Sequence, residues 1–206
     1  ARNFKSITIV DEEQGSYLWD AKDLDERIKY ALSGLDVILD PEEIRTELLR
    51  SVFDGMKQKD LNKTIQLNAK TLIEKDAELA VFAARITLTF MYEETLPWTA
   101  NLLAETGMAG LKEVHQLNFE KYLKRGVDIG LLDPKLLETF DLNRIASVID
   151  PSADMQFEML GIQTMYDRYL IIDKTTKKHR RIEVPQYFWM RVAMGLALRE
   201  KNPTDK

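Results

Sequence analysis

The hydrophobic and polar positions of the chain follow two different periods. Near the N-terminus, Ser6 to Val10 and Tyr17 to Trp19 are short apolar runs separated by an acidic turn that contains Gly15. Such runs are typical of a small β-hairpin or cap. From residue 20 onward, apolar residues recur every three or four positions, which is the spacing of one face of an α-helix. The chain is therefore predicted to be mainly α, an N-terminal helical bundle with a small β cap followed by a helical domain that ends in a β-hairpin and a helix.

Acidic residues and prolines predict where the first helices begin. We expect Asp20 to cap a helix that runs to Gly34. Asp40 to Glu43 combine a capping acid, a proline at the first helical position and acids in the first turn. This second helix is expected to continue to a stop at Gly55.

Two more helices complete the predicted N-terminal bundle. The third opens at Lys59-Asp60, with Leu67 among its inward positions, and the fourth begins at Asp76 and ends near Pro97. The apolar residues of the fourth helix are dense enough to predict burial on most sides. Arg85 lies within it, and because a buried arginine is costly unless paired, we expect an acidic partner in a structural ion pair rather than a ligand contact.

The second half of the chain is predicted to be helical until a hairpin near its end. Helices are expected over residues 111–124, after Asp133-Pro134 and over residues 142–149. Residues 169–172 and 181–184 alternate well enough for a two-stranded hairpin. A last helix starts at Pro185. We place a soft boundary around Leu96 to Thr106, so that residues 1–95 form one region and residues 96–206 the other.

Charge and composition exclude several classes of function. The net charge of -5 and the pI near 5.3 argue against a surface that tracks a nucleic-acid backbone. The one basic run, Lys174 to Arg181, holds six basic residues. It could contact an anionic partner, but a solvated hairpin turn is the preferred interpretation. No apolar stretch is long enough to span a bilayer, and the N-terminus lacks the pattern of a signal peptide, so we expect a cytoplasmic protein without a membrane partner.

The supply of reactive side chains is small. The chain has no cysteine, which excludes disulfides, cysteine-ligated metals and cysteine nucleophiles. With only His115 and His179, both expected at the surface, we predict no metal site and no catalytic residue. Two carboxylate groups, Glu93-Glu94 and Asp11 to Glu13, are expected to be solvated charges rather than acid/base pairs.

Several motifs then occur in an order that identifies a family. An acid-proline helix start is followed by a Phe53-Asp54-Gly55 turn and by Ala83-Ala84-Arg85. Further on, DPSAD at Asp150 to Asp154 leads into GIQTMYDRYLI and VPQYFWMRVAMGLAL. In this order they resemble the front of the large (α) subunit of aerobic, class I ribonucleotide reductase. That part comprises an ATP-cone and the helical domain that precedes a catalytic barrel.

The resemblance implies an activity for the full-length protein rather than for this chain. The family reduces ribonucleoside diphosphates to deoxyribonucleotides by radical chemistry at barrel cysteines. A metal-radical centre in a partner β subunit generates the radical, and ATP and deoxyribonucleotides act as effectors. A chain without cysteine is expected to be an N-terminal fragment that is inactive alone and holds no cofactor. Its implied partners are the barrel of its own subunit, the β subunit and nucleotides.

The resemblance also permits a test of the nucleotide pocket. The family's cone has a basic, glycine-containing turn after its first strand, whereas residues 9–15 of this chain carry acids. Phe90 and Glu93 stand where the family has a histidine and a lysine. Asp60 alone matches an acidic pocket position, and it could equally be a helix N-cap. We expect a degenerate cone kept for packing. The alternatives are a regulatory module that binds ATP or dATP through residues 6–95, and a free-standing helical interaction protein.

The aromatic residues near the end of the chain are assigned to packing. Tyr166 to Tyr169 could suggest radical transfer, but the family's relevant tyrosines lie elsewhere, so these residues are expected to serve packing and domain docking. Tyr187 to Met190 are expected in the core. The small residues Ala193, Gly195 and Ala197 would let the last helix approach a neighbour, which the resemblance suggests is the barrel.

Overall fold

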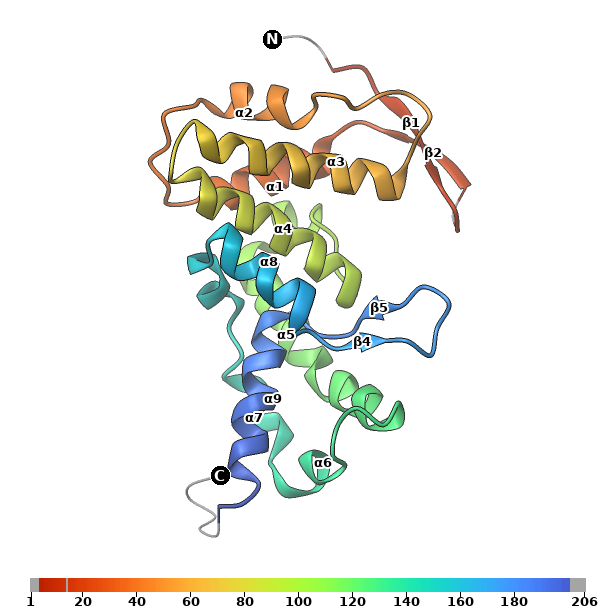
Figure 1. Cartoon of the computed structure of the whole chain (residues 1–206), viewed down its shortest axis with the longest axis vertical. Helices are drawn as coiled ribbons and strands as arrows, with labels where there is room; N and C mark the ends of the chain where they lie inside the picture. Colours follow the sequence, from red (N-terminus) through yellow and green to blue (C-terminus); the bar gives the residue numbers. More distant parts are fainter. Residues whose placement is uncertain (1–3, 14, 201–206) are drawn as a thin grey trace. The chain divides into compact units, whose positions relative to one another are not determined.

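Helices predominate in the computed structural model, which describes residues 4–13 and 15–200 (Figure 1). The strands form one three-stranded and one two-stranded sheet. The predicted fold class, mainly α with small β elements, is therefore confirmed. Within the described residues, no helix is both long and apolar enough to cross a membrane.

The chain divides into two compact units. Unit 1 comprises residues 1–90 and 156–162, and unit 2 comprises residues 91–155 and 163–206. Helices α4 (Leu79–Thr95) and α8 (Met159–Arg168) each contribute residues to both units. This division does not test the functional boundary expected near residue 96, which stays a prediction.

A small sheet closes one end of the bundle in unit 1. Strands β1 (Ile7–Asp11) and β2 (Gly15–Trp19) form the predicted antiparallel hairpin, with Ile9 opposite Tyr17. A third strand, β3 (Met56–Lys57), pairs parallel to β1. The Gly55 N–H donates to the Thr8 carbonyl at 2.8 Å, which fixes this crossover. Two residues are too few for a periodic pattern, so the sequence did not predict this strand.

The helices of unit 1 pack around an apolar core. Their bounds are α1 Lys22–Leu32, α2 Pro41–Leu48, α3 Gln58–Thr71, a 3₁₀ turn at Leu72–Glu74 and the part of α4 up to Phe90. Asp40 caps α2 as predicted, because its carboxylate accepts from Glu42 N and Glu43 N while Glu43 reaches back to Asp40 N. Helix α4 is buried along most of this length, which confirms its predicted place in the core.

Three local predictions for unit 1 are wrong. Asp20 does not cap α1, since the cap position is Ala21 in a left-handed conformation with φ of 63°. Helix α2 ends at Leu48 rather than continuing to Gly55, and Ser51 adopts a φ of 72° that a helix cannot contain. Leu67, expected to point inward, is 49% exposed. In the first two cases a left-handed residue, Ala21 or Ser51, sets the helix boundary.

Unit 2 is built on one long helix. Helix α5 (Leu102–Asp128) kinks at Gly107, whose φ is 57°, and is longer at both ends than predicted. The other elements are α6 Lys135–Thr139, α7 Leu142–Ser147, a 3₁₀ helix at Pro151–Gln156, strands β4 Ile172–Asp173 and β5 Arg180–Arg181, and α9 Pro185–Ala197. The last helix begins at Pro185, as predicted.

The predicted second hairpin is also present. Strands β4 and β5 pair antiparallel, with Ile172 opposite Arg181. The Ile182 N–H donates to the Ile171 carbonyl at 3.0 Å, which extends the pairing by one step. The regular strands are shorter than the predicted ones, and the basic residues lie on β5 and in the turn.

Candidate functional site

The predicted nucleotide residue Asp60 lies at the start of α3. It is the third residue of the helix and is exposed. The cap position is Lys57, so the interpretation of Asp60 as the N-cap is wrong. Asp60 lines neither of the two cavities described below. Its proposed part in nucleotide binding stays a prediction.

The acidic turn between β1 and β2 carries its charge at the surface. Asp11 Oδ1 accepts from Glu13 N at 2.7 Å, and the Glu12 carboxylate lies 3.8 Å from Lys57 Nζ. The Tyr17 hydroxyl bonds to Gln58 Oε1, which joins the hairpin to the start of α3. Negative charge at this turn would repel a triphosphate.

Phe90, which the resemblance suggested stands in place of a histidine, lies beneath a buried cation. Its ring centroid is 3.9 Å from the Arg27 guanidinium carbon, and Arg27 is only 2% exposed. Arg27 Nη1 donates to Thr89 Oγ1 at 2.8 Å, and its Nε lies 3.6 Å from Asp23 Oδ2. A cation over an aromatic face is a favourable contact. Both side chains are therefore engaged with each other instead of facing a ligand.

Arg85 is buried as predicted, but main-chain carbonyls supply part of its pairing. Its Nη1 donates to Ala31 O at 3.1 Å and to Ser33 O at 2.7 Å. These carbonyls lie at the C-terminal end of α1, where the helix dipole favours a cation. The sequence predicted an acidic partner and not these main-chain carbonyls. Burial lowers the pKa of Arg85 below its usual value, and the residue has a structural role.

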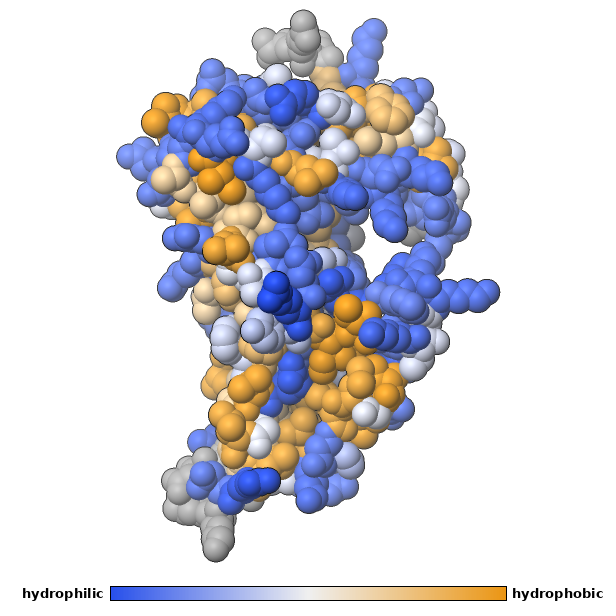
Figure 2. Space-filling view, in the orientation of Figure 1, coloured by the Kyte–Doolittle hydropathy of each residue, from blue (hydrophilic) through white to orange (hydrophobic). Residues whose placement is uncertain are grey.

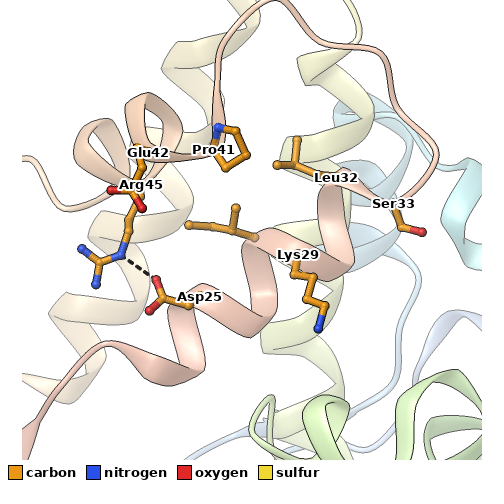
Figure 3. A pocket seen from close by; sticks show the side chains of 8 residues that line it. Asp25, Lys29, Leu32, Ser33, Pro41, Glu42 and Arg45 are labelled. Atoms are coloured by element: carbon orange, nitrogen blue, oxygen red, sulfur yellow. Dashed lines mark hydrogen bonds and ion pairs between the residues drawn. The ribbon is translucent and has the colours of Figure 1, made fainter. Parts of the chain in front are cut away.

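A shallow groove of about 420 Å³ lies between α1 and α2 of unit 1 (Figure 3). Ile28, Leu32 and Pro41 give it an apolar floor. Its rim carries both signs of charge, and Asp25 and Arg45 pair across it at 2.6 Å. This mixed rim gives no preference for an anionic or a cationic ligand.

The core of unit 2 holds a carboxylate network centred on Glu183. This side chain is fully buried. It accepts hydrogen bonds from the Tyr122 hydroxyl, from Ile171 N at 3.0 Å and from Arg191 Nε at 2.6 Å. Burial, with the Glu183 charge beside it, raises the pKa of Tyr122 far above its usual value, so the phenol stays protonated as a donor. The network joins α5, the hairpin and α9.

The DPSAD motif contributes two aspartates with opposite environments. Asp154 is 1% exposed and accepts from the Tyr92 hydroxyl and from Gln186 Nε2, both at 2.7 Å. Burial raises its pKa to about 6. Asp150 is more exposed, and its hydrogen bond with Lys112 at 2.8 Å lowers its pKa to about 2. Both aspartates anchor other elements of unit 2.

Glu93 and Glu94 lie at the end of α4, as predicted, but they are only partly exposed and are hydrogen-bonded. Glu93 Oε1 accepts from Ala100 N at 2.8 Å, which holds the turn after α4. Glu94 accepts from the Tyr166 hydroxyl and from Arg181 N, each at 2.9 Å. The Arg181 guanidinium lies 3.3 Å from the Tyr166 ring centroid. These contacts give Tyr166 the packing role that was predicted, and burial raises its pKa to about 12.

One histidine also differs from the prediction. His115 is fully buried, with Nδ1 2.8 Å from Leu111 O and its ring 4.9 Å from that of Tyr92. Burial lowers its pKa to about 4, so it is neutral at neutral pH. His179 is exposed in the hairpin turn, as predicted. Within the described part of the chain, no group of three or more potential ligands could hold a metal ion.

The predicted core cluster at Tyr187 to Met190 is buried only in part. Tyr187 is 1% exposed and stacks on Tyr122 with centroids 4.8 Å apart. Trp189 is 52% exposed, so its assignment to the core is wrong. A second cavity, of about 310 Å³, opens between α5 and the β4–β5 hairpin.

The fold and these motifs match one family. Residues 155–206 match the family model described as ribonucleotide reductase, all-alpha domain. The chain is 32% identical over 200 residues to the ribonucleoside-diphosphate reductase subunit alpha of Chlamydia muridarum, covering 97% of this chain and 18% of that protein. With the subunit alpha of Helicobacter pylori it shares 32% identity over 151 residues, and with that of phage T4 23% over 204 residues. These matches cover 73% and 97% of this chain and 17% and 24% of those proteins.

The chain therefore belongs to the ribonucleotide reductase large-subunit family, and the resemblance found in the sequence is confirmed. It corresponds to the N-terminal helical region of the alpha subunits. It spans about a fifth of the length of the relatives it matches.

Proposed function

We propose that this chain is the N-terminal region of an α subunit of ribonucleoside-diphosphate reductase, and that the whole subunit reduces ribonucleotides to deoxyribonucleotides for DNA synthesis in the cytoplasm. The observation that carries the proposal is the similarity over 97% of the chain to a subunit of that name. The thiol chemistry would come from the catalytic barrel, because this chain contains no cysteine. This region alone would be inactive.

The region would not hold the enzyme's cofactor. The metal-radical centre is assigned to a partner β subunit, as the resemblance to the family implies. The residues do not fit a bound triphosphate either. Acids occupy the β1–β2 turn, and Phe90 and Arg27 are buried against each other. These features support a degenerate ATP-cone in which the bundle of unit 1 is kept for packing.

An apolar stripe on α9 supports a contact with the rest of the subunit. Trp189, Val192 and Leu196 lie at helical spacing and are 52%, 37% and 76% exposed. Figure 2 shows hydrophobic side chains gathered over the part of unit 2 that contains α9. The small residues Ala193 and Gly195 between them are exposed too and would permit close approach. Such a stripe marks a surface that another protein element covers.

The whole-enzyme proposal is tested with the full-length protein and its β subunit. The pair is expected to reduce a ribonucleoside diphosphate, and chromatography measures the deoxyribonucleotide product. As a surface test, Leu196→Glu in the full-length protein should lower the rate, whereas Ile38→Glu, at an 84% exposed position of unit 1, should not. No reduction by the native pair would contradict the assignment of the activity.

The degenerate cone is tested separately by calorimetry. Titration of the chain with ATP or dATP should give no heat beyond dilution up to millimolar nucleotide, because carboxylates replace the cations at the turn. Saturable heat would instead favour the regulatory module that binds nucleotides through residues 6–95. Asp60→Asn should abolish that heat if Asp60 contacts the nucleotide.

A further inference from the structure

The second cavity forms a groove with basic residues on both sides. We call it the basic groove. Helix α5 supplies one wall, with Lys121 and Arg125 one turn apart, and the β4–β5 hairpin supplies the other, with Arg180 and Arg181. The lining also includes two carboxylates, Glu94 and Asp173, and two aromatic residues, Tyr122 and Tyr187. All of these residues belong to unit 2.

The groove has an excess of positive charge. Four cations line it against two carboxylates, which gives a net formal charge of +2. Both carboxylates are already engaged. Asp173 accepts from Arg125 Nε at 2.9 Å, and Glu94 Oε1 lies 3.9 Å from Arg181 Nη1. Each carboxylate is therefore paired with an arginine of the groove, which leaves the charge of Lys121 in excess.

The hairpin turn extends the positively charged surface beyond the groove. Lys174, Lys177 and Lys178 are exposed, and no acidic residue occurs between Asp173 and Glu183. Among the described residues, Lys121, Lys174 and Lys177 have no ion-pair partner. The chain as a whole carries -5, so this is a local concentration of the opposite sign. Hydrophilic side chains cover the region of the hairpin in Figure 2.

The geometry favours an extended ligand over a compact phosphate. The guanidinium of Arg125 already holds Asp173 and Thr175, and that of Arg181 donates to Tyr166 O. Their planar forks are therefore not free to converge on one phosphate. The available cations are instead spread along α5 and the hairpin turn. Such a field suits a ligand with several separated negative charges.

The lining also disfavours nucleic acid. Single-stranded nucleic acid binds by stacking its bases on accessible aromatic rings. The two aromatic residues of the groove, Tyr122 and Tyr187, are 5% and 1% exposed and stack on each other. No accessible ring of the groove can receive a base. We propose that the basic groove and the adjoining lysines of the hairpin turn bind an extended acidic peptide segment of a partner protein.

The test measures binding of labelled probes to the 206-residue chain by fluorescence anisotropy. The probes are a short glutamate-rich peptide, the same peptide with glutamine in place of every glutamate, and a deoxythymidine oligomer of equal formal charge. The groove variant combines Lys121→Gln, Lys174→Gln and Lys177→Gln. A matched control combines Lys5→Gln, Lys63→Gln and Lys135→Gln, three exposed lysines outside the groove. Both variants change the net charge equally, and circular dichroism checks their folding.

The native chain should bind the glutamate-rich peptide and not the glutamine peptide. Because each exposed ion pair contributes modestly, the groove variant should bind about tenfold more weakly, and the control variant should bind like the native chain. High salt should weaken the native interaction. Equal losses in both variants, absence of peptide binding, or tighter binding of the deoxythymidine oligomer would each overturn the proposal. None of these results bears on the reductase assignment.

Discussion

The two units bury charged side chains of different kinds. In unit 1 the buried ionic groups include Arg27 and Arg85, which are 2% and 8% exposed. In unit 2 they include the carboxylates Asp154 and Glu183, accompanied by the imidazole of His115. Arginine keeps its proton throughout the range in which proteins are stable, whereas carboxylates and imidazole titrate within it. The pH-dependent contributions to the stability of this chain should therefore arise mainly in the core of unit 2.

The partners of these groups differ accordingly. The arginines of unit 1 contact main-chain carbonyl oxygens, a threonine hydroxyl and an aromatic face. Tyrosine hydroxyls, a glutamine amide, a main-chain N–H and Arg191 donate to the carboxylates of unit 2. Removing a carboxylate would leave several buried donors without an acceptor. Removing Arg27 from unit 1 would leave Thr89 and Asp23, which each retain another hydrogen-bond partner.

The largest effect is expected at Glu183. Glu183→Ala removes the acceptor of Tyr122, Ile171 N and Arg191 at once. Breaking a buried pair from one side costs about 3–5 kcal/mol of unfolding free energy. Denaturant unfolding can be followed in a Trp19→Phe background, in which Trp98 and Trp189 report on unit 2. Glu113→Ala, at an exposed site of α5, is the control and should change stability little. A comparably small loss at Glu183 would show that the network is dispensable.

The sequence predicted those features that local rules determine. Neighbouring residues determine the capping box at Asp40, the start of α9 at Pro185 and the two hairpins. The burial of α4 follows from its own apolar content. Errors arose where a turn conformation intervened, as at Ser51. A left-handed residue is not visible in an apolar pattern.

The buried polar groups could not be predicted in the same way. Tyr122 and Glu183 are 61 positions apart, and Arg181 and Glu94 are 87 apart. No periodicity relates residues at such distances, so Glu94 and His115 were assigned to the surface. One signal was available: Glu183 lies directly between Ile182 and Val184, and an acid within a short apolar run indicates a buried, paired carboxylate.

A second prediction concerns two buried groups with opposing pH effects. The pKa of Asp154 is raised from 3.8 to about 6, so the folded state binds its proton more tightly than the unfolded state does. Its contribution to stability therefore increases as the pH falls from about 6 to 4. The pKa of His115 is lowered to about 4 from an unfolded value near 6.5. Unfolding then takes up a proton, and this contribution decreases as pH falls through the same window. The two should largely cancel in the native chain.

Single substitutions should separate these effects. In Asp154→Asn only the contribution of His115 remains, and unit 2 should lose stability as the pH falls from 6.5 to 4, relative to the native chain. In His115→Gln only the contribution of Asp154 remains, and unit 2 should gain stability over this range relative to the native chain. Each difference should reach about 2–3 kcal/mol at most. Denaturant midpoints of the two variants, measured across this range in the Trp19→Phe background, provide the check. Slopes of the same sign would contradict the assignment.

The smallest effect is expected for a cation of unit 1. Arg27→Met keeps the long apolar stem and places a thioether against Phe90, which is a favourable contact. Thr89 still donates to Ile86 O at 2.7 Å, and Asp23 still accepts from Trp19 Nε1 at 2.5 Å. Replacing a buried ionic group by a well-packed apolar one is often nearly neutral, so the loss should be about 1 kcal/mol or less.

The unfolding free energy for this last prediction is measured by the fluorescence of Trp19 in a background with Trp98→Phe and Trp189→Phe. The remaining tryptophan then reports on unit 1. The change should be the same at pH 6.5 and pH 4, because arginine does not titrate there. A loss as large as that of Glu183→Ala would mean that the charge itself holds unit 1 together. The contrast between a replaceable cation and an indispensable carboxylate would then be wrong, since both units would depend on buried ionic partners to the same degree.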